Sequence, residues 1–325
     1  MITLVEMISI WKALIITLLS VSDVYSAAPN TVPSREISGL EFLYNSTNGE
    51  DWLWRGPVGQ WDFSGSVNPC DPLWQGVTCD CSSTCTIVNL ELSEYDLDGT
   101  IPPQISWLPN LTAFDFSVNR LHHTIPDSIG DLSKMSLIDL HENEMTGTIP
   151  EEIQSLSSIL AQLDLSANLF GGNFSAALCE LTVLANFNVL RTRMSGSIPS
   201  CINKMSSLTF LDMGSNKYTG ELPDELGGIP SLEYIRMAYN RFRGSLPSTV
   251  CSLQSLTYLD FSVNDITGTV PSCIGSLTML THLVFYVNRM GGTIPPDTSK
   301  LVNLHKFYVG FNEFTGPLPV VDLSA

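Results

Sequence analysis

A repeat of 24 residues runs through most of this 325-residue chain and limits what it can fold into. The segments FDFSVNRLHHTIP, IDLHENEMTGTIP and LDMGSNKYTGELP share one pattern of apolar residues around an asparagine. Ten repeats follow one another in this register, with one step of 25 residues between Asn143 and Asn168. The asparagine column reads Tyr95, Asn119, Asn143, Asn168, Thr192, Asn216, Asn240, Asn264, Asn288, Asn312. No single unit of this length can bury its own apolar positions, so the pattern predicts stacked coils that share one continuous core.

Each unit reads L-x-x-L-x-L-x-x-N-x-L-x-G-x-I-P, which identifies the chain as a leucine-rich repeat protein. The asparagine amide is expected to donate to and accept from buried backbone groups of neighbouring turns that would otherwise lack partners. The Gly-x-Ile-Pro segments, such as GTIP at 147–150 and GSLP at 244–247, resemble the plant-type subclass of extracellular leucine-rich repeats. The resemblance covers residues 87–319 and implies an α/β repeat fold, a right-handed curved solenoid with a parallel sheet on its concave face.

The residues ahead of the repeats resemble the N-terminal cap of the same family, which is known from receptor-like kinases, receptor-like proteins, secreted inhibitors and protist surface antigens. The positions that match the cap motif are Cys70, Trp74, Gly76, Val77 and Cys79. A short helix is expected before them, capped by Ser34, with Ile37, Leu40 and Leu43 on the face that covers the first coil.

The cap is rich in tryptophan. Its four tryptophans are Trp52, Trp54, Trp61 and Trp74. We expect these rings to form the core of the cap rather than a ligand cage, because large aromatic rings contribute most of their energy through burial.

The N-terminus has the pattern of a secretory signal peptide: Lys12, an apolar run at 13–21, and small residues around Ser26. Cleavage is expected after Ser26, with a retained signal anchor as the alternative. The expected organisation is therefore a signal peptide at 1–26, a cap at 27–86 and ten repeats at 87–325. The last repeat ends at FTGPLPVVDLSA without a closing cap, so either a partner covers that end or the chain is incomplete.

Eight cysteines in an exported chain favour disulfides over metal binding or catalysis. Cys179 and Cys201 occupy the same two points on adjacent coils as Cys251 and Cys273 do. Adjacent coils stack about 5 Å apart, so the spacing predicts one disulfide within each of these pairs.

The remaining four cysteines are Cys70, Cys79, Cys81 and Cys85. The family resemblance implies a Cys70–Cys79 bond, which leaves Cys81 with Cys85. The other two connectivities stay open, and so does a zinc cluster, although the usual zinc spacing is missing.

Composition narrows the function classes. Charged residues make up only 15% of the chain, and removal of residues 1–26 leaves 14 basic and 31 acidic residues, a net charge of −17. This balance excludes nucleic acid as a partner and fits either a cationic ligand or a secreted surface kept apart by like charge. Three N-x-S/T sequons, at Asn45, Asn110 and Asn173, are candidate glycosylation sites.

Catalytic chemistry has little support in the sequence. The histidines are His122, His123, His141, His282 and His305. None of them recurs beside a serine or cysteine in a pattern that suggests a nucleophile and its general base. The His122–His123 pair is interpreted as an exposed loop rather than a metal site. No glycine-rich phosphate loop precedes a helix. The chain is therefore expected to be no enzyme and to hold no metal or cofactor.

Two columns of the repeat, six and four residues before the asparagine, should face the concave side. The second column is Glu91, Asp115, Asp139, Asp164, Asn188, Asp212, Arg236, Asp260, Val284 and Tyr308. An acid that recurs this often is interpreted mainly as part of the scaffold. The first column carries aromatic residues only in later repeats, at Phe210, Tyr234 and Tyr258.

An aromatic patch mixed with charges is therefore expected at one end of the concave sheet. Its candidate ligand-binding residues are Phe210, Asp212, Tyr234, Arg236, Tyr239, Tyr258, Asp260, Tyr286, Tyr308 and Phe311. Such a surface suits a protein, peptide or glycan ligand. The alternative is a cross-strand ladder that only stabilises the sheet.

The sequence thus predicts a non-catalytic, extracellular or cell-surface protein that binds a ligand through its concave face. By resemblance, the alternatives are the ectodomain of a membrane receptor or surface antigen, and a secreted inhibitor of a wall-degrading hydrolase. Membrane association would require a missing segment, a retained signal anchor or a partner, because no later stretch holds 18 apolar residues.

Overall fold

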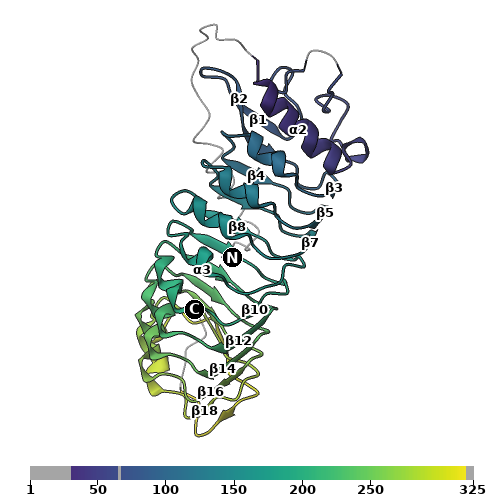
Figure 1. Cartoon of the computed structure of the whole chain (residues 1–325). Helices are drawn as coiled ribbons and strands as arrows, with labels where there is room; N and C mark the ends of the chain where they lie inside the picture. The colour runs from purple at the N-terminus through teal and green to yellow at the C-terminus, as the bar shows by residue number, and fades with distance from the viewer. Residues whose placement is uncertain (1–30, 65–66, 320–325) are drawn as a thin grey trace.

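The computed structural model describes residues 31–64 and 67–319. The coils follow one another in chain order, from the cap around α2 (Ser34–Ser46) to the repeats around β18 (Gly291–Gly292), and form one elongated stack (Figure 1). The solenoid that the 24-residue repeat predicted is confirmed. The predicted signal peptide at 1–26 lies outside the described residues. Within the described residues, no helix combines the length and apolar character needed to cross a membrane.

One sheet of eleven strands runs the length of the stack. Its strands, in spatial order, are β1 (Val77–Asp80), β2 (Thr86–Glu91), β4 (Ala113–Asp115), β6 (Leu137–Asp139), β8 (Gln162–Asp164), β9 (Asn186–Asn188), β11 (Phe210–Asp212), β13 (Tyr234–Arg236), β15 (Tyr258–Asp260), β17 (His282–Val284) and β19 (Lys306–Tyr308). Strand β1 is antiparallel to β2, and the others pair in parallel with equivalent residues side by side. Equivalent positions of successive repeats therefore form straight columns.

Three short sheets follow the asparagine turns on another side of the coils. They comprise β3 (Asp98–Gly99), β5 (Arg120–His123) and β7 (Glu144–Met145); β10 (Ser195–Gly196), β12 (Lys217–Glu221), β14 (Arg241–Ser245) and β16 (Asp265–Thr267); and β18 with β20 (Glu313–Phe314). Short helical segments complete the coils: α3 (Ala176–Cys179) and the 3-10 helices Gly49–Asp51, Pro103–Trp107, Asp127–Asp131, Glu151–Leu156, Ser200–Lys204, Asp224–Gly228, Ser248–Ser252, Ser272–Ser276 and Pro296–Lys300.

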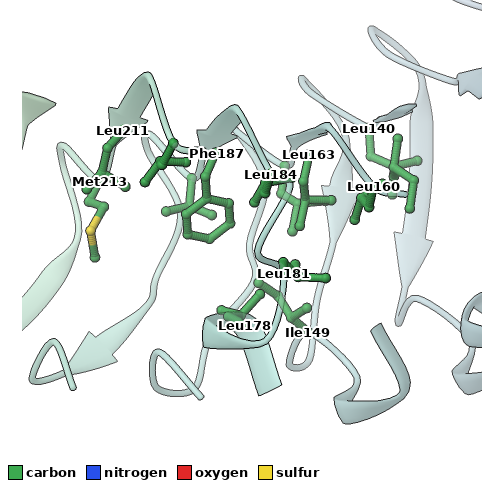
Figure 2. Close-up of a cluster of buried hydrophobic side chains, with 14 of the residues drawn as sticks. Leu140, Ile149, Leu160, Leu163, Leu178, Leu181, Leu184, Phe187, Leu211 and Met213 are labelled. Atoms are coloured by element: carbon green, nitrogen blue, oxygen red, sulfur yellow. The ribbon is translucent and has the colours of Figure 1, made fainter. Parts of the chain in front are cut away.

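The apolar positions of every repeat point into one continuous core. Figure 2 shows a section of it, in which Leu140, Leu163 and Phe187 of successive coils lie in a row. All three side chains are at most 1% exposed. A coil therefore buries its apolar face against its neighbours, as the repeat length requires.

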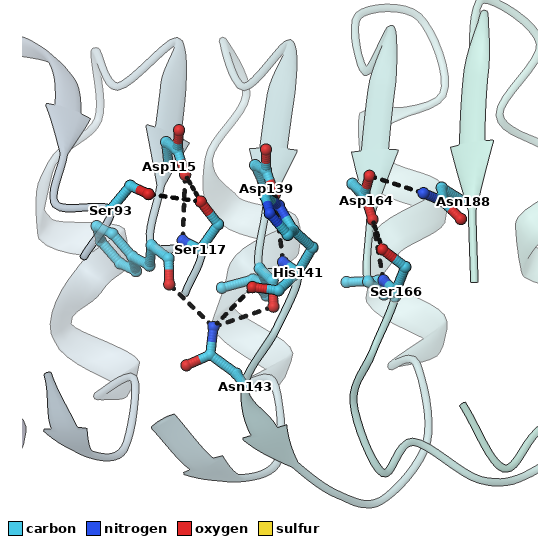
Figure 3. A network of polar contacts seen from close by, with 12 residues as sticks. Ser93, Asp115, Ser117, Asp139, His141, Asn143, Asp164, Ser166 and Asn188 are labelled. Atoms are coloured by element: carbon cyan, nitrogen blue, oxygen red, sulfur yellow. Dashed lines mark hydrogen bonds and ion pairs between the residues drawn. The ribbon is translucent and has the colours of Figure 1, made fainter. Parts of the chain in front are cut away.

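The asparagine column bonds as predicted. Asn143 Nδ2 donates to the carbonyls of Phe116 at 2.9 Å and Leu140 at 3.1 Å (Figure 3). Its Oδ1 accepts from the backbone N–H of Leu121 at 2.9 Å. One side chain thus links its own turn to the preceding coil. Thr192, which replaces asparagine in one repeat, donates to Val189 O at 3.0 Å.

The cap closes the N-terminal end. Leu40 and Leu43 of α2 are buried and Ile37 is partly buried. Trp52, Trp61 and Trp74 are buried, and Trp54 packs against them. The tryptophans therefore form a core, as expected.

The prediction that Ser34 caps α2 is wrong. Pro33 occupies the N-cap position, with φ −54° and ψ 138°, and Ser34 is already the first helical residue. Proline presets a suitable φ for a helix start, so no serine side chain is needed there. The buried Glu36 ties the helix to the first coil, because its carboxylate accepts from Thr86 Oγ1 at 2.8 Å and from the Ile87 N–H at 2.8 Å.

Four disulfides join the pairs named from the sequence. They are Cys70–Cys79, Cys81–Cys85, Cys179–Cys201 and Cys251–Cys273. The last two span adjacent coils with Cα separations of 5.8 and 5.9 Å. Equivalent positions on stacked coils are therefore close enough to be joined, as the repeat spacing predicted.

Candidate functional site

The acidic column of the large sheet has a structural task. Asp212 Oδ1 accepts from the Gly214 N–H at 2.9 Å, and Asp260 Oδ1 accepts from the Ser262 N–H at 2.8 Å. Asn188 does the same for Leu190 at 3.1 Å. Each side chain satisfies a backbone donor just after the strand ends, where the chain turns towards the asparagine column. These bonds support the interpretation of this column as mainly scaffold.

In the N-terminal repeats the column joins a polar network (Figure 3). His141 Nδ1 contacts Asp139 Oδ1 at 2.6 Å, and Asn188 Nδ2 donates to Asp164 Oδ2 at 2.9 Å. Burial opposes protonation of His141, but the hydrogen bond that its ring donates to the Asp139 carboxylate, together with the nearby carboxylates, raises its pKa. Burial and the Asp139 carboxylate raise the pKa of Asp164.

Asp139, His141 and Asp164 bring potential ligand atoms within 4.8 Å of one another. These atoms already have partners: Asp139 Oδ1 contacts His141 Nδ1 at 2.6 Å, and Asp164 accepts from the Ser166 hydroxyl at 2.6 Å and from Asn188 Nδ2 at 2.9 Å. The sequence does not single out this trio, although His141 lies two residues after an acid of the column and so shares its face.

The aromatic column forms a stack in the later repeats. Phe210 and Tyr234 have ring centroids 4.4 Å apart with planes 11° from parallel, and Tyr234 and Tyr258 are 4.4 Å apart at 15°. His282 continues the row, 5.0 Å from Tyr258. The rings face one another, so their edges rather than their faces meet solvent. The cross-strand ladder considered from the sequence is therefore present, whatever the surface binds.

Charged side chains lie beside this ladder. Arg236 lies between Asp212 and Asp260, with Nη1 3.5 Å from one carboxylate and Nε 3.9 Å from the other. Burial raises the pKa of Asp212 from its usual 3.8 to about 6, although Arg236 opposes the shift. Burial also raises the pKa of Tyr234 and of Tyr258. Tyr258 Oη donates to Asp260 Oδ2 at 3.4 Å, so the aromatic column and the acid column are in contact here.

The remaining candidate aromatics are the exposed ones. Tyr239, Tyr286, Tyr308 and Phe311 are 54%, 41%, 52% and 75% exposed. Tyr286 and Phe311 meet edge to face with centroids 5.2 Å apart, which links two coils. These four rings, together called the aromatic surface here, offer faces that the stacked ladder does not.

The three sequons differ in how free their amides are. Asn45 and Asn173 are exposed, although Asn173 Oδ1 accepts from Ser195 Oγ at 3.3 Å. Asn110 is half-buried, and its amide donates to Thr86 Oγ1 at 2.9 Å and accepts from Lys134. Glycosylation stays a prediction, with Asn45 and Asn173 as the accessible acceptors.

Comparisons with known proteins agree with this geometry. The Leucine Rich Repeat family model matches residues 207–229, 231–253 and 255–277. A probable leucine-rich repeat receptor-like serine/threonine-protein kinase of Arabidopsis thaliana is 30% identical over 124 residues, which is 33% of this chain and 11% of that relative. The ectodomain of the Arabidopsis thaliana receptor kinase GASSHO1/SCHENGEN3, solved with CASPARIAN STRIP INTEGRITY FACTOR 2, superposes with a TM-score of 0.81 at 28% identity. The chain is a leucine-rich repeat solenoid that is similar to plant receptor ectodomains.

The structural match to GASSHO1/SCHENGEN3 covers 88% of this leucine-rich repeat chain and 33% of that one. The Arabidopsis receptor kinase HAESA, solved with the peptide hormone IDA and the co-receptor SERK1, matches with a TM-score of 0.70 at 25% identity over 88% of this chain and 51% of its own. The chain matches about a tenth of the length of the probable receptor-like kinase named above.

Proposed function

We propose that the protein is an extracellular, non-catalytic binding protein that holds a peptide or protein segment against the C-terminal part of its large sheet. The observation that carries this proposal is the aromatic surface beside the Asp212–Arg236–Asp260 charges. Exposed aromatic rings next to charged groups are typical of surfaces that bind proteins and peptides.

The class of ligand follows from two lines of support. The ladder presents ring edges and hydroxyl groups in a row, and Arg236 supplies a cation for an acidic or carboxylate group. GASSHO1/SCHENGEN3 and HAESA are each described in complex with a ligand, a peptide hormone in the case of HAESA. A glycan is the alternative, since aromatic rings also stack on sugars.

Export is part of the same proposal. Four disulfides fit an oxidising compartment, and the predicted cleavage after Ser26 supplies the route. Sequencing the N-terminus of the protein recovered from the medium should give Ala27 first. A mature protein that starts at Met1 would contradict this step.

The binding proposal is tested with the aromatic surface and a matched control at the other end. The first variant is Tyr308→Ala with Phe311→Ala, and the control is Phe42→Ala. Phe42 is a suitable control because it is 44% exposed and meets Trp107 edge to face at 5.4 Å. Peptides selected on the intact protein from a displayed random library serve as probes.

We expect the double variant to bind the selected peptides about tenfold more weakly, or weaker still. Truncation of an aromatic anchor commonly costs about 2 kcal/mol or more of binding free energy. Phe42→Ala should leave their affinity unchanged. Recovery of no peptide, or equal affinity for all three proteins, would overturn the proposal.

A second candidate function is the ectodomain of a membrane receptor. It is favoured by similarity to a receptor-like kinase and to two receptor kinase ectodomains. Fractionation of the source cells decides between the two candidates. Recovery in the medium supports a secreted binder, whereas recovery with the membrane fraction after a high-salt wash supports the receptor.

A further inference from the structure

A second surface lies on the short sheet β10–β12–β14–β16, which is separate from the eleven-stranded sheet and is labelled in the lower half of Figure 1. An open hollow of about 500 Å³ crosses this sheet. The side chains that shape it are Thr219, Arg241, Arg243, Asp265, Thr267 and Arg289. Three guanidinium groups thus surround one carboxylate in a chain with a formal net charge of −18. We call the hollow that these six residues line the lateral hollow.

The ion pairs leave two of the three arginines available. Arg289 Nη2 contacts Asp265 Oδ1 at 2.8 Å and neutralises the one acid of the hollow. In the part of the chain that the structure describes, no ion pair or hydrogen bond engages the guanidinium of Arg241 or Arg243. Both side chains are exposed. Arg120, in the equivalent column of an earlier repeat, is instead held by Asp96 at 2.7 Å.

Neighbouring acids cancel only part of this charge. Arg243 lies in register between Glu221 of β12 and Asp265 of β16. Glu221 forms no ion pair among residues 31–64 and 67–319, and Asp265 is already bonded to Arg289. The hollow therefore keeps an excess of positive charge, and arginine is the side chain best shaped to hold carboxylate or sulfate oxygens in a two-pronged contact.

The cations extend beyond the hollow as a row along the stack. The residue after the asparagine column is Arg193, Lys217, Arg241, Asp265 and Arg289 in five successive repeats. Successive coils are about 5 Å apart, as hydrogen-bonded strands are. That spacing is about the length of one sugar ring in an extended polysaccharide. Alternate residues of an extended peptide are about 6.5 Å apart and would lose register within a few coils.

We propose that the lateral hollow and this row bind a linear anionic polysaccharide through its carboxylate or sulfate groups. Arg241 and Arg243 hold one anionic group in the hollow. The hydroxyls of Thr219 and Thr267 donate to the carbonyls of Gly196 and Gly244, and their oxygens accept from sugar hydroxyls. Lys217 and Arg193 extend the contact to further sugars, one for each coil. Several weak exposed contacts add up on one polymer, which a single small anion could not achieve. This site does not depend on the proposed peptide site, because it lies on another sheet.

The test compares two variants with the same change in net charge. Arg241→Gln with Arg243→Gln removes the two unpaired arginines. Arg120→Gln with Lys204→Gln is the control, because both side chains are about half exposed and each pairs with an acid outside the hollow. The probes are a polyuronate, dextran sulfate of similar length, neutral dextran and poly-glutamate, each titrated at two salt concentrations.

We expect the intact protein to bind at least one anionic polysaccharide, and the hollow variant to bind it about tenfold more weakly with a smaller dependence on salt. The control variant should bind like the intact protein. Binding of the polyuronate alone identifies a carboxylate ligand, and binding of dextran sulfate alone identifies a sulfate ligand.

Three outcomes would overturn the proposal of a polysaccharide site. They are absence of binding to both anionic polysaccharides, equal weakening by the two variants, and binding of poly-glutamate as tight as that of the polysaccharides. Equal thermal unfolding of the two variants, followed by circular dichroism, ensures that any loss reflects the site rather than the fold.

Discussion

The two ends of the large sheet differ in the side chains that line its outward face. In β4 to β9 the outward positions carry Asp115, Asp139, Asp164 and Asn188, and these side chains bond into a polar network. In β11 to β15 the same acid column persists, but the neighbouring column changes to stacked rings. The hydrogen bond that a backbone N–H of the turn donates to the acid is present in both regions. The comparison separates a column constrained by the backbone from a column that is free to vary with function.

If the scaffold is uniform, each residue of the asparagine column should contribute the same free energy of unfolding in both regions. Asn143→Ala and Asn264→Ala should each lower the free energy of unfolding by about 4 kcal/mol, because several buried backbone groups lose their partner. Asn264 bonds to Phe242, Met237 and Phe261 much as Asn143 bonds to its own neighbours. Urea unfolding of the two variants measures both values. A difference above about 2 kcal/mol would show that the coils are not equivalent.

The acid column should make stability depend on pH in both regions, because burial raises the pKa of Asp164 and of Asp212, and Asp212 allows a test. Because the pKa of Asp212 rises to about 6 on folding, the folded state binds more protons than the unfolded state between about pH 4 and pH 6. This residue therefore lowers the free energy of unfolding as pH rises through that window, by about 3 kcal/mol at most.

Asp212→Asn removes this titration while an amide oxygen still accepts from Gly214, as Asn188 does naturally for Leu190. The free energy of unfolding of the variant, minus that of the intact protein, should increase as pH rises from about 4 to about 6. Above about pH 7 this difference should stay constant at its full value. Urea unfolding at several pH values measures the gain. A constant difference across the window would mean that Asp212 titrates normally.

Most of the fold could be predicted from the sequence because the repeat is a strong, periodic signal. The register of ten coils, the asparagine bonding and the disulfides Cys179–Cys201 and Cys251–Cys273 all follow from equivalent positions lying side by side. The helix start was missed because Pro33 and Ser34 both favour that position, and only the backbone angles distinguish them.

The site was only partly predictable. The outward columns were assigned correctly, but the sequence could not say that Tyr234 and Tyr258 would turn their faces to each other while Tyr286 and Phe311 stay exposed. Ring orientation depends on the neighbours on both coils, not on the repeat pattern. The lateral hollow was missed because its arginines follow the asparagine, outside the columns of the large sheet. The RFR segment at 241–243 was the available signal.

The ladder is the feature that distinguishes the C-terminal region, and its energy can be isolated. A double-mutant cycle with Tyr234→Leu and Tyr258→Leu should give a coupling energy of about 1 kcal/mol, as stacked aromatic pairs do beyond their burial. The control cycle replaces Leu137 and Gln162 by Ala, a pair that lies in register in the N-terminal region. Its coupling should be below about 0.5 kcal/mol. Equal coupling in both cycles would mean that the rings add nothing specific to the sheet.

The smallest expected effect concerns a backbone position where one N-terminal coil departs from all the later ones. His123 has φ +67° at a point where Gly147, Gly172 and Gly196 have φ near +80° in the next three repeats. Glycine adopts this conformation without strain, whereas a residue with a Cβ atom does not. His123→Gly should therefore raise the free energy of unfolding by about 0.5 kcal/mol after the added freedom of the unfolded chain is allowed for.

The matched exchange in the next coil should act in the opposite direction. A Cβ atom at Gly147 would lie 2.5 Å from Thr124 Cγ2, so Gly147→His should destabilise the protein by more than His123→Gly stabilises it. Urea unfolding of both variants compares the signs. If His123→Gly instead lowered stability, the His122–His123 ring contact would contribute more than the backbone strain costs, and this coil would be specialised rather than merely imperfect.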